Sequence, residues 1–143
     1  MSKAFECAVR LLSRREHGAY ELANKLAQKG YPEADIQDTL SECQRLGLQN
    51  DTRFVDSLLR ARIRQGYGPL RIRRELQNVQ IDRDLIDAAL HEEADNWLSY
   101  ATMVWKKKFK DQQELTYPVI QKQKQFLLYR GFSTDIITMM FNH

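Results

Sequence analysis

The sequence predicts an all-α protein made of three tandem three-helix repeats, stacked into an elongated, curved molecule. Glycine and proline are scarce, with six and three among 143 residues, so few positions interrupt regular structure. Apolar residues recur at the i, i+3, i+4, i+7 spacing of helices that bury one face. This pattern also returns about every 50 residues along the chain, which indicates internal repetition.

A frame of five positions defines the repeat. Its first copy consists of Leu22, Leu26, Tyr31, Ile36 and Leu40. The second copy is Ile72, Leu76, Ile81, Ile86 and Leu90, and the third is Gln123, Leu127, Phe132, Ile137 and Phe141. A three-helix unit of this size leaves too much apolar surface exposed to be stable alone. The three units are therefore expected to stack in a row as one continuous structural domain.

The first repeat, residues 1–51, is expected to contain helices near 2–16, 19–29 and 33–46. The apolar face of its first helix consists of Phe5, Ala8, Val9 and Leu12. Gly30 and Gly47 end the second and third helices, because a left-handed residue after a helix favours glycine. Pro32 suits the first helical position, where a missing N–H breaks no hydrogen bond.

The second repeat, residues 52–93, is expected to contain helices near 52–65, 69–78 and 83–93. Its first helix has an apolar face made of Phe54, Val55, Leu58 and Leu59. Asp51 and Asp82 are N-cap candidates for the first and third helices, since their carboxylates can accept orphan backbone N–H groups. Gly66 ends the first helix, and Pro69 suits the first position of the second.

The third repeat, residues 94–143, is expected to contain helices near 94–110, 118–130 and 134–142. Its first helix carries an apolar face made of Trp97, Ala101, Val104 and Trp105. The two tryptophans are predicted to be core residues rather than a platform for stacking bases. Pro118 suits a helix start, Gly131 a helix end, and Ser133 an N-cap.

The sequence argues against several functional classes. No stretch approaches the roughly 18 uncharged residues of a membrane span, so we expect a cytoplasmic protein without membrane contact. Cys7 and Cys43 lack CxxC spacing and a histidine partner, which indicates reduced, half-buried thiols. The Gly66-Tyr67-Gly68 turn lacks the third glycine and the lysine of a phosphate-binding loop. We therefore expect no catalytic residue, metal or cofactor, and no enzyme activity.

The net charge of +3 conceals two basic clusters. One comprises Arg60, Arg62, Arg64, Arg71, Arg73 and Arg74, with Tyr67 in the turn between their helices. The other comprises Lys106, Lys107, Lys108, Lys110, Lys122, Lys124 and Arg130. At 100° per residue Arg60 and Arg64 point to water and are free for a partner. Arg62 falls within the apolar face and must snorkel or pair with a carboxylate or helix carbonyls. The clusters are explained either by solubility and helix dipoles or by contact with a polyanion.

Three segments carry a resemblance to a known family. The run Arg62–Pro69, continued by Arg71-Ile72-Arg73 and Glu75-Leu76, resembles the central signature of the RecX family, bacterial regulators of the RecA recombinase. The segment Asp51–Phe54 is similar to the opening of the family's second repeat, and Phe126–Phe132 to its C-terminal signature. The chain departs from the family at Gly18, where a Ser or Thr cap commonly precedes Glu-Leu.

The resemblance implies a regulatory protein that binds the groove of the RecA filament on single-stranded DNA and inhibits RecA ATPase, recombinase activity and filament extension. DNA repair and the SOS response would be modulated in consequence. The residues of the two basic clusters, with Tyr67, are the expected contacts with RecA or with DNA backbone phosphates. We expect a monomer.

Two other classes stay open from the residues alone. Helix, glycine turn and helix recur three times, so the chain could be a helix-turn-helix protein that reads duplex DNA, with Arg71 to Arg74 at the start of the recognition helix. The third class is a scaffold whose charges are merely solvated.

Overall fold

The computed structural model describes residues 2–112 and 114–142, and within these ranges the chain forms nine helices and no strand. The helices are α1 (Lys3–Arg14), α2 (Ala19–Gln28), α3 (Glu33–Arg45), α4 (Asp51–Arg64), α5 (Pro69–Asn78), α6 (Arg83–Glu92), α7 (Trp97–Phe109), α8 (Tyr117–Tyr129) and α9 (Thr134–Phe141). Every predicted helix is present, and the all-α tandem-repeat fold is confirmed.

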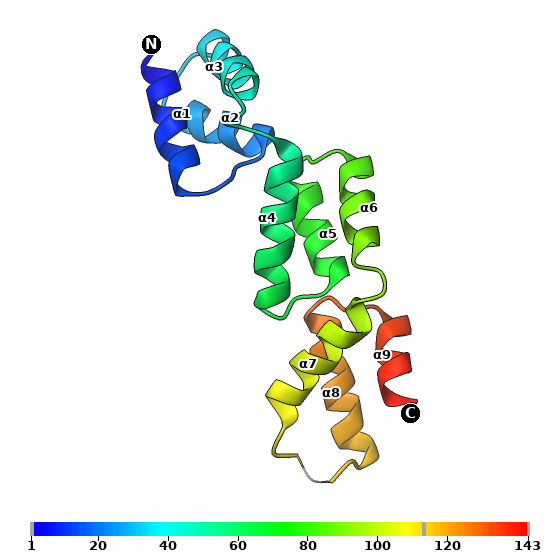
Figure 1. Cartoon of the computed structure of the whole chain (residues 1–143). Coiled ribbons are helices and arrows are strands. Elements are labelled where there is room, and N and C mark those ends of the chain that lie inside the picture. Colours follow the sequence, from blue (N-terminus) through cyan, green and yellow to red (C-terminus); the bar gives the residue numbers. More distant parts are fainter. Residues whose placement is uncertain (1, 113, 143) are drawn as a thin grey trace.

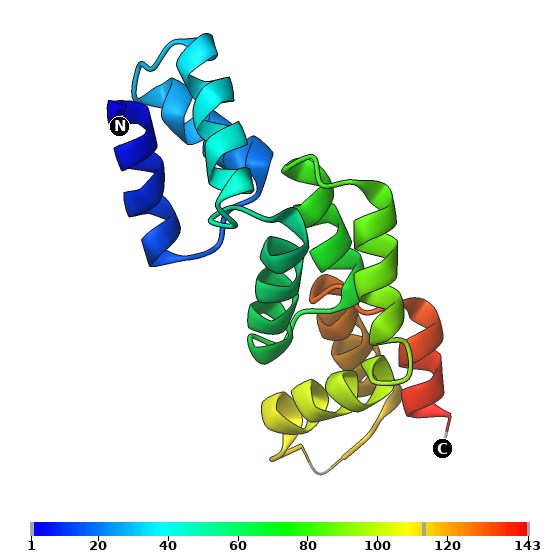
Figure 2. The same ribbon diagram turned by 45° about the horizontal axis from the view of Figure 1, so that its top comes forward.

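The helices are arranged in three groups that follow one another along the long direction of the molecule (Figure 1). We call α1–α3 module 1, α4–α6 module 2 and α7–α9 module 3. The turned view keeps the same succession, with the two chain ends in opposite terminal modules (Figure 2). The long shape agrees with the predicted row of three units.

Local chemistry explains most helix boundaries. Gly30, Gly47, Gly66 and Gly131 all have positive φ, from 73° to 98°, as predicted for residues that end a helix. The side chains of Asp82 and Ser133 accept backbone N–H bonds at the starts of α6 and α9, which confirms these two caps.

Three predicted boundary residues lie one position away from their expected place. Asn50, not Asp51, caps α4, because its side chain accepts the Arg53 backbone N–H. Pro32 is the N-cap residue of α3, and Pro118 is the second residue of α8. Pro69 alone of the prolines takes the predicted first position.

The buried apolar residues form two separate clusters. One fills module 1, and the other runs without a break through modules 2 and 3. Trp97 belongs to the second cluster at 5% exposure, which confirms its core role. Cys7 and Cys43 are free thiols, but both are fully buried rather than half-buried, and burial raises the pKa of the Cys43 thiol.

The polar member of the repeat frame, Gln123, is explained by a partner on the neighbouring helix. Its side chain is 1% exposed, and its Oε1 accepts a hydrogen bond from Trp105 Nε1 at 2.8 Å. The half-buried Trp105 also meets Phe141 edge to face at 6.1 Å. The third module thus needs a polar residue where the other two have leucine or isoleucine, because an indole N–H is buried beside it.

Modules 2 and 3 are joined by direct backbone contact between two turns. The Gly68 N–H donates to the Arg130 carbonyl at 2.8 Å, and the Leu70 N–H donates to the Gly131 carbonyl at 2.9 Å. A Cβ on Gly131 would lie 2.5 Å from the Cβ of Arg71, and one on Gly68 would lie 2.5 Å from the Gly131 carbonyl carbon. Only glycine at both positions permits this approach.

Modules 1 and 2 are joined mainly by polar groups. Asp51 Oδ1 accepts the Ala19 backbone N–H at 2.8 Å, so a carboxylate from α4 caps α2, whose own N-cap Gly18 has no side chain. Gln49 Nε2 donates to the His17 carbonyl at 3.1 Å and to Asp51 Oδ1 at 2.9 Å. The missing Ser or Thr before α2 is therefore replaced by a cap from the next module.

Replacing Gly131 by alanine tests the backbone contact. The Gly131→Ala variant should lower the free energy of unfolding by about 3 kcal/mol, because the methyl group meets Arg71 and the positive φ strains an L-residue. Gly30→Ala is the matched control, since Gly30 has a similar φ but nothing within 4 Å of the added Cβ; it should lose only about 1 kcal/mol. Urea unfolding followed by far-ultraviolet circular dichroism measures both, and equal losses would contradict the proposed clash.

His17 should make module 1 sensitive to acid. Its buried ring contacts the Arg15 carbonyl through Nδ1 at 3.1 Å and Lys25 Nζ through Nε2 at 3.0 Å, so the neutral Nδ1–H tautomer satisfies both. Burial, opposed by the bond to Arg15, lowers the pKa of His17. The unfolded chain then binds more protons than the folded one, so stability is full above a pH of about 6.5 and is lost as the pH falls below it.

Urea unfolding between pH 7.5 and 5.5 measures this loss, which should not exceed about 1.4 kcal/mol per pH unit. His17→Gln should remove most of the slope in this interval, whereas His91→Gln, at an exposed position, should keep it. An unchanged slope in His17→Gln would assign the acid sensitivity to other groups.

Candidate functional site

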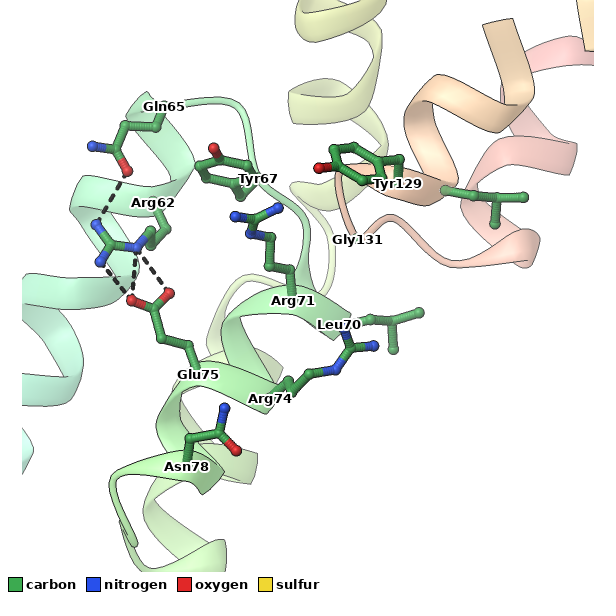
Figure 3. Close-up of a pocket in the computed structure, with 11 residues that line it drawn as sticks. Arg62, Gln65, Tyr67, Leu70, Arg71, Arg74, Glu75, Asn78, Tyr129 and Gly131 are labelled. Carbon is green, nitrogen blue, oxygen red and sulfur yellow. Dashed lines mark hydrogen bonds and ion pairs between the residues drawn. The ribbon is translucent and has the colours of Figure 1, made fainter. Parts of the chain in front are cut away.

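Basic and aromatic side chains gather at the junction of modules 2 and 3. They surround a cleft of about 810 Å³ between α5 and the C-terminal end of α8 (Figure 3). We call it the basic cleft, and it is lined by Arg62, Gln65, Tyr67, Leu70, Arg71, Arg74, Glu75, Asn78, Leu128, Tyr129 and Gly131. The backbone contact between the two turns sets the distance between its walls.

Arg62 is committed to the structure of the cleft. Its Nε donates to Glu75 Oε2 at 2.8 Å, and its Nη1 donates to Gln65 Oε1 at 3.1 Å (Figure 3). The hydrogen bond that Arg62 donates to Glu75 raises the pKa of the guanidinium further. Of the alternatives expected for Arg62, a carboxylate partner is the one observed, and its charge is compensated within the cleft.

Tyr67 holds two arginines in place. The guanidinium carbon of Arg71 lies 4.0 Å from the centre of the Tyr67 ring, and that of Arg130 lies 5.0 Å from it. Arg130 also donates from Nη1 to the Gln65 carbonyl at 3.0 Å, which ties module 3 to the end of α4. Tyr67 therefore orients cations, and its ring is occupied by them.

Arg71 and Arg74 supply the uncompensated charge of the cleft. Neither has a carboxylate of a described residue within 4.0 Å, whereas the third arginine of the cleft is paired. Arg71 is half-buried and is fixed against Tyr67, and Arg74 is exposed. A guanidinium presents a planar fork of N–H donors, so this pair suits phosphate or carboxylate oxygens.

Tyr129 is a cleft residue that the sequence analysis did not assign to the interface. It lies on the wall opposite Arg71 (Figure 3) and is 77% exposed. Leu70 and Leu128, which also line the cleft, are exposed as well. The sequence feature that could have indicated an interface role for Tyr129 is its position on the polar side of a helix, immediately before Arg130 and Gly131. A large aromatic ring in water beside unpaired arginines is typical of a contact surface.

The other module 2 arginines that were predicted to contact a partner either pair with a nearby carboxylate or lie outside the basic cleft. The expectation that Arg60 is free for a partner is wrong, because its Nε binds Asp56 Oδ2 at 3.0 Å across one helical turn. Arg73 binds Asp87 on α6 at 2.7 Å. Arg64 is exposed, as predicted, but lines a second groove rather than the basic cleft.

The predicted lysines of module 3 do not enter the basic cleft. Lys106, Lys107, Lys108 and Lys110 are exposed at the end of α7, and Lys122 is exposed on α8. Lys124 is half-buried, with Nζ 5.5 Å from the centre of the Phe141 ring. Lys107 and Lys108 join Arg64 and Arg130 at the second groove.

Two further findings bear on function. Among residues 2–112 and 114–142, no group of three or more His, Cys, Asp or Glu side chains is placed to hold a metal ion. None of the helices in these ranges is both long and apolar enough to cross a membrane.

The fold defines a tandem helical-repeat protein with a basic cleft at a module junction. Models of the first, second and third three-helix domains of RecX match residues 4–43, 50–90 and 95–139. The chain is 57% identical over 141 residues to regulatory protein RecX of Legionella pneumophila strain Corby, covering 99% of this chain and 94% of that one. The chain belongs to the RecX family of regulatory proteins.

More distant relatives agree. Regulatory protein RecX of Vibrio campbellii is 42% identical over 133 residues, which cover 93% of this chain and 86% of that one. The crystal structure of RecX from Lactobacillus salivarius superposes with a TM-score of 0.83 at 26% identity, covering 96% of this chain and 92% of that one. The three-module architecture is thus shared with a solved structure.

Removing the charge of Glu75 tests whether the cleft binds anions. In Glu75→Gln, Arg62 loses its counter-charge, so a 30-nucleotide poly-dT strand should bind more tightly. The slope of log affinity plotted against log salt concentration should become steeper by about 0.7. The half-exposed pair contributes about 1 kcal/mol to stability, so the variant should remain folded.

Asp56→Asn is the matched control for this measurement. It makes the same change of charge beside Arg60, outside the cleft, and should leave the slope unchanged. Fluorescence anisotropy of the labelled strand, measured from about 50 to about 300 mM NaCl, gives the slope for each variant. Equal steepening in the two variants would show that the cleft holds no preferred place for the strand.

Proposed function

We propose that this protein is a regulator that binds the RecA filament on single-stranded DNA and lowers RecA ATPase, strand exchange and filament extension. It would thereby modulate DNA repair and the SOS response, without chemistry of its own. The observation that carries the proposal is the pair of uncompensated arginines, Arg71 and Arg74, in a cleft of a long repeat scaffold. Membership of the RecX family supplies the partner.

A rigid, elongated binder can inhibit a filament by occupation alone. A molecule lodged in a helical groove excludes incoming duplex and restrains the subunit rotation that filament turnover needs. The shared core and the backbone contact support this mode, because modules 2 and 3 would present their cations at fixed separations. Preformed geometry lowers the entropy lost on binding. The filament lies in the cytoplasm, so the proposal places the protein there, as a monomer without a cofactor.

The fold weighs against the alternative of a duplex reader. A helix-turn-helix protein inserts the first residues of its second helix into the major groove. In module 2 that helix is α5, and its first turn packs against module 3 through Gly68 and Leu70. Gly68 is buried, so the residue that leads into α5 is covered by the chain itself.

The proposal is tested with purified RecA on single-stranded DNA. The wild-type protein should reduce DNA-dependent ATP hydrolysis and filament growth, and Arg71→Glu/Arg74→Glu should need at least about tenfold more protein for half-inhibition, since each reversal replaces attraction by repulsion. Arg83→Glu, at an exposed arginine outside the cleft, is the control and should inhibit like the wild type.

Two outcomes would contradict the proposal. Unchanged ATPase and filament growth at saturating wild-type protein would exclude RecA inhibition. The duplex reader would instead be favoured by two results together. The protein would bind one duplex sequence more tightly than random DNA by several kcal/mol, and it would bind that duplex more tightly than the RecA filament.

A further inference from the structure

A second groove, between the C-terminal end of α4 and α7, differs in chemistry from the basic cleft. It encloses about 760 Å³, and its floor is apolar, made of Ile63, Tyr100, Met103, Val104 and Phe126. Its rim carries the cations Arg64, Lys107, Lys108 and Arg130. We call it the apolar groove. Both views place the end of α4 beside α7 (Figures 1 and 2).

The rim of the apolar groove is an uncompensated cationic surface. Arg64, Lys107 and Lys108 are exposed, and no carboxylate of a described residue lies within 4.0 Å of their charged nitrogens. None of the residues that line the groove is acidic. An occupant with carboxylates or phosphates near its ends would therefore be attracted to this rim.

The floor favours a protein side chain over a nucleic-acid base. Single-stranded nucleic acid binds apolar sites by stacking bases on open aromatic rings. Here the ring of Phe126 is already met by Arg130 at 5.1 Å, by Lys108 at 5.6 Å and edge-on by Phe109 at 5.4 Å. Its aromatic surface is therefore in use.

The other floor residues are suited to an apolar anchor. Tyr100 is fixed by a bond from its hydroxyl to Glu93 Oε2 at 2.6 Å. Met103 is 66% exposed, the most exposed of the long aliphatic side chains in the described chain. A flexible thioether in water beside a branched residue such as Val104 is typical of surfaces that adapt to an inserted apolar side chain.

We infer that the apolar groove binds a protein segment in which a large apolar side chain is flanked by carboxylates. The anchor would cover Met103 and Val104, and the carboxylates would meet Arg64, Lys107 and Lys108 on the rim. This inference rests on the proposed function and deepens it: the apolar groove makes the contact with the protein of the filament, while Arg71 and Arg74 in the basic cleft remain available to DNA phosphates.

The first test observes the groove directly in the full-length protein with ¹³C-labelled methionine methyl groups. The probe is a synthetic peptide with one phenylalanine between two runs of three glutamates. It should shift the Met103 methyl signal and leave that of Met139, which lies on α9 outside the groove, in place. Peptides with serine for phenylalanine, or lysine for glutamate, should give at most a tenth of the shift at equal concentration. Absence of a shift with the first peptide overturns the inference.

The second test separates the two partners. Met103→Glu should weaken binding to RecA at least tenfold in the absence of DNA, and should leave binding to a 30-nucleotide poly-dT strand within twofold of wild type. Met139→Glu makes the same charge change at another exposed methionine and should alter neither.

The outcomes distinguish the inference from the proposed function. If the wild type binds RecA and Met103→Glu binds it equally well, the groove is not the protein contact and the proposed function stands. If Met103→Glu loses the oligonucleotide rather than RecA, the groove binds nucleic acid and the inference is overturned. If the wild type binds neither free RecA nor the RecA filament, the proposed function fails, and the methyl shift with the acidic peptide alone decides for or against the groove.

Discussion

The contact between the turn before α5 and the turn after α8 is the constraint on which the candidate site depends. Two glycines let the backbones approach closely enough for the Gly68 N–H to reach the Arg130 carbonyl. Arg130 then extends back over Tyr67 to the end of α4, and Tyr67 in turn holds Arg71. One close approach therefore sets the walls of the basic cleft and the position of a cation shared with the apolar groove.

The other junction is built differently, and this divides the chain into two mechanical parts. Module 1 has its own buried cluster, and its link to module 2 relies on Asp51, Gln49 and the His17 carbonyl. Modules 2 and 3 thus share one apolar core, while module 1 has its own core and is attached through polar contacts, to which the Arg53–Glu16 ion pair also contributes.

Features that depend on neighbours in sequence could be predicted, and those that depend on another repeat could not. Helix positions, glycine ends and the caps at Asp82 and Ser133 follow from local chemistry, and the conflict at Arg62 was visible from its helical face. The role of Asp51 was missed because its partner, Ala19, lies on a helix of another module. The pairing of Arg60 was missed because a surface side chain can choose between solvent and a carboxylate four residues away.

The cleft itself could not be predicted, since its walls come from parts of the chain that lie far apart in the sequence. Tyr129 can be recognised as a cleft residue only once the fold places it opposite Arg71.

The same geometry explains why a modest net charge is no argument against an anionic partner. Acidic residues such as Asp56, Asp87 and Glu75 neutralise the arginines that the fold needs, and leave Arg71, Arg74 and the groove cations uncompensated. With the basic cleft and the apolar groove both occupied as proposed, two weak contacts on one body act at high effective concentration, so each can bind modestly while the pair holds firmly.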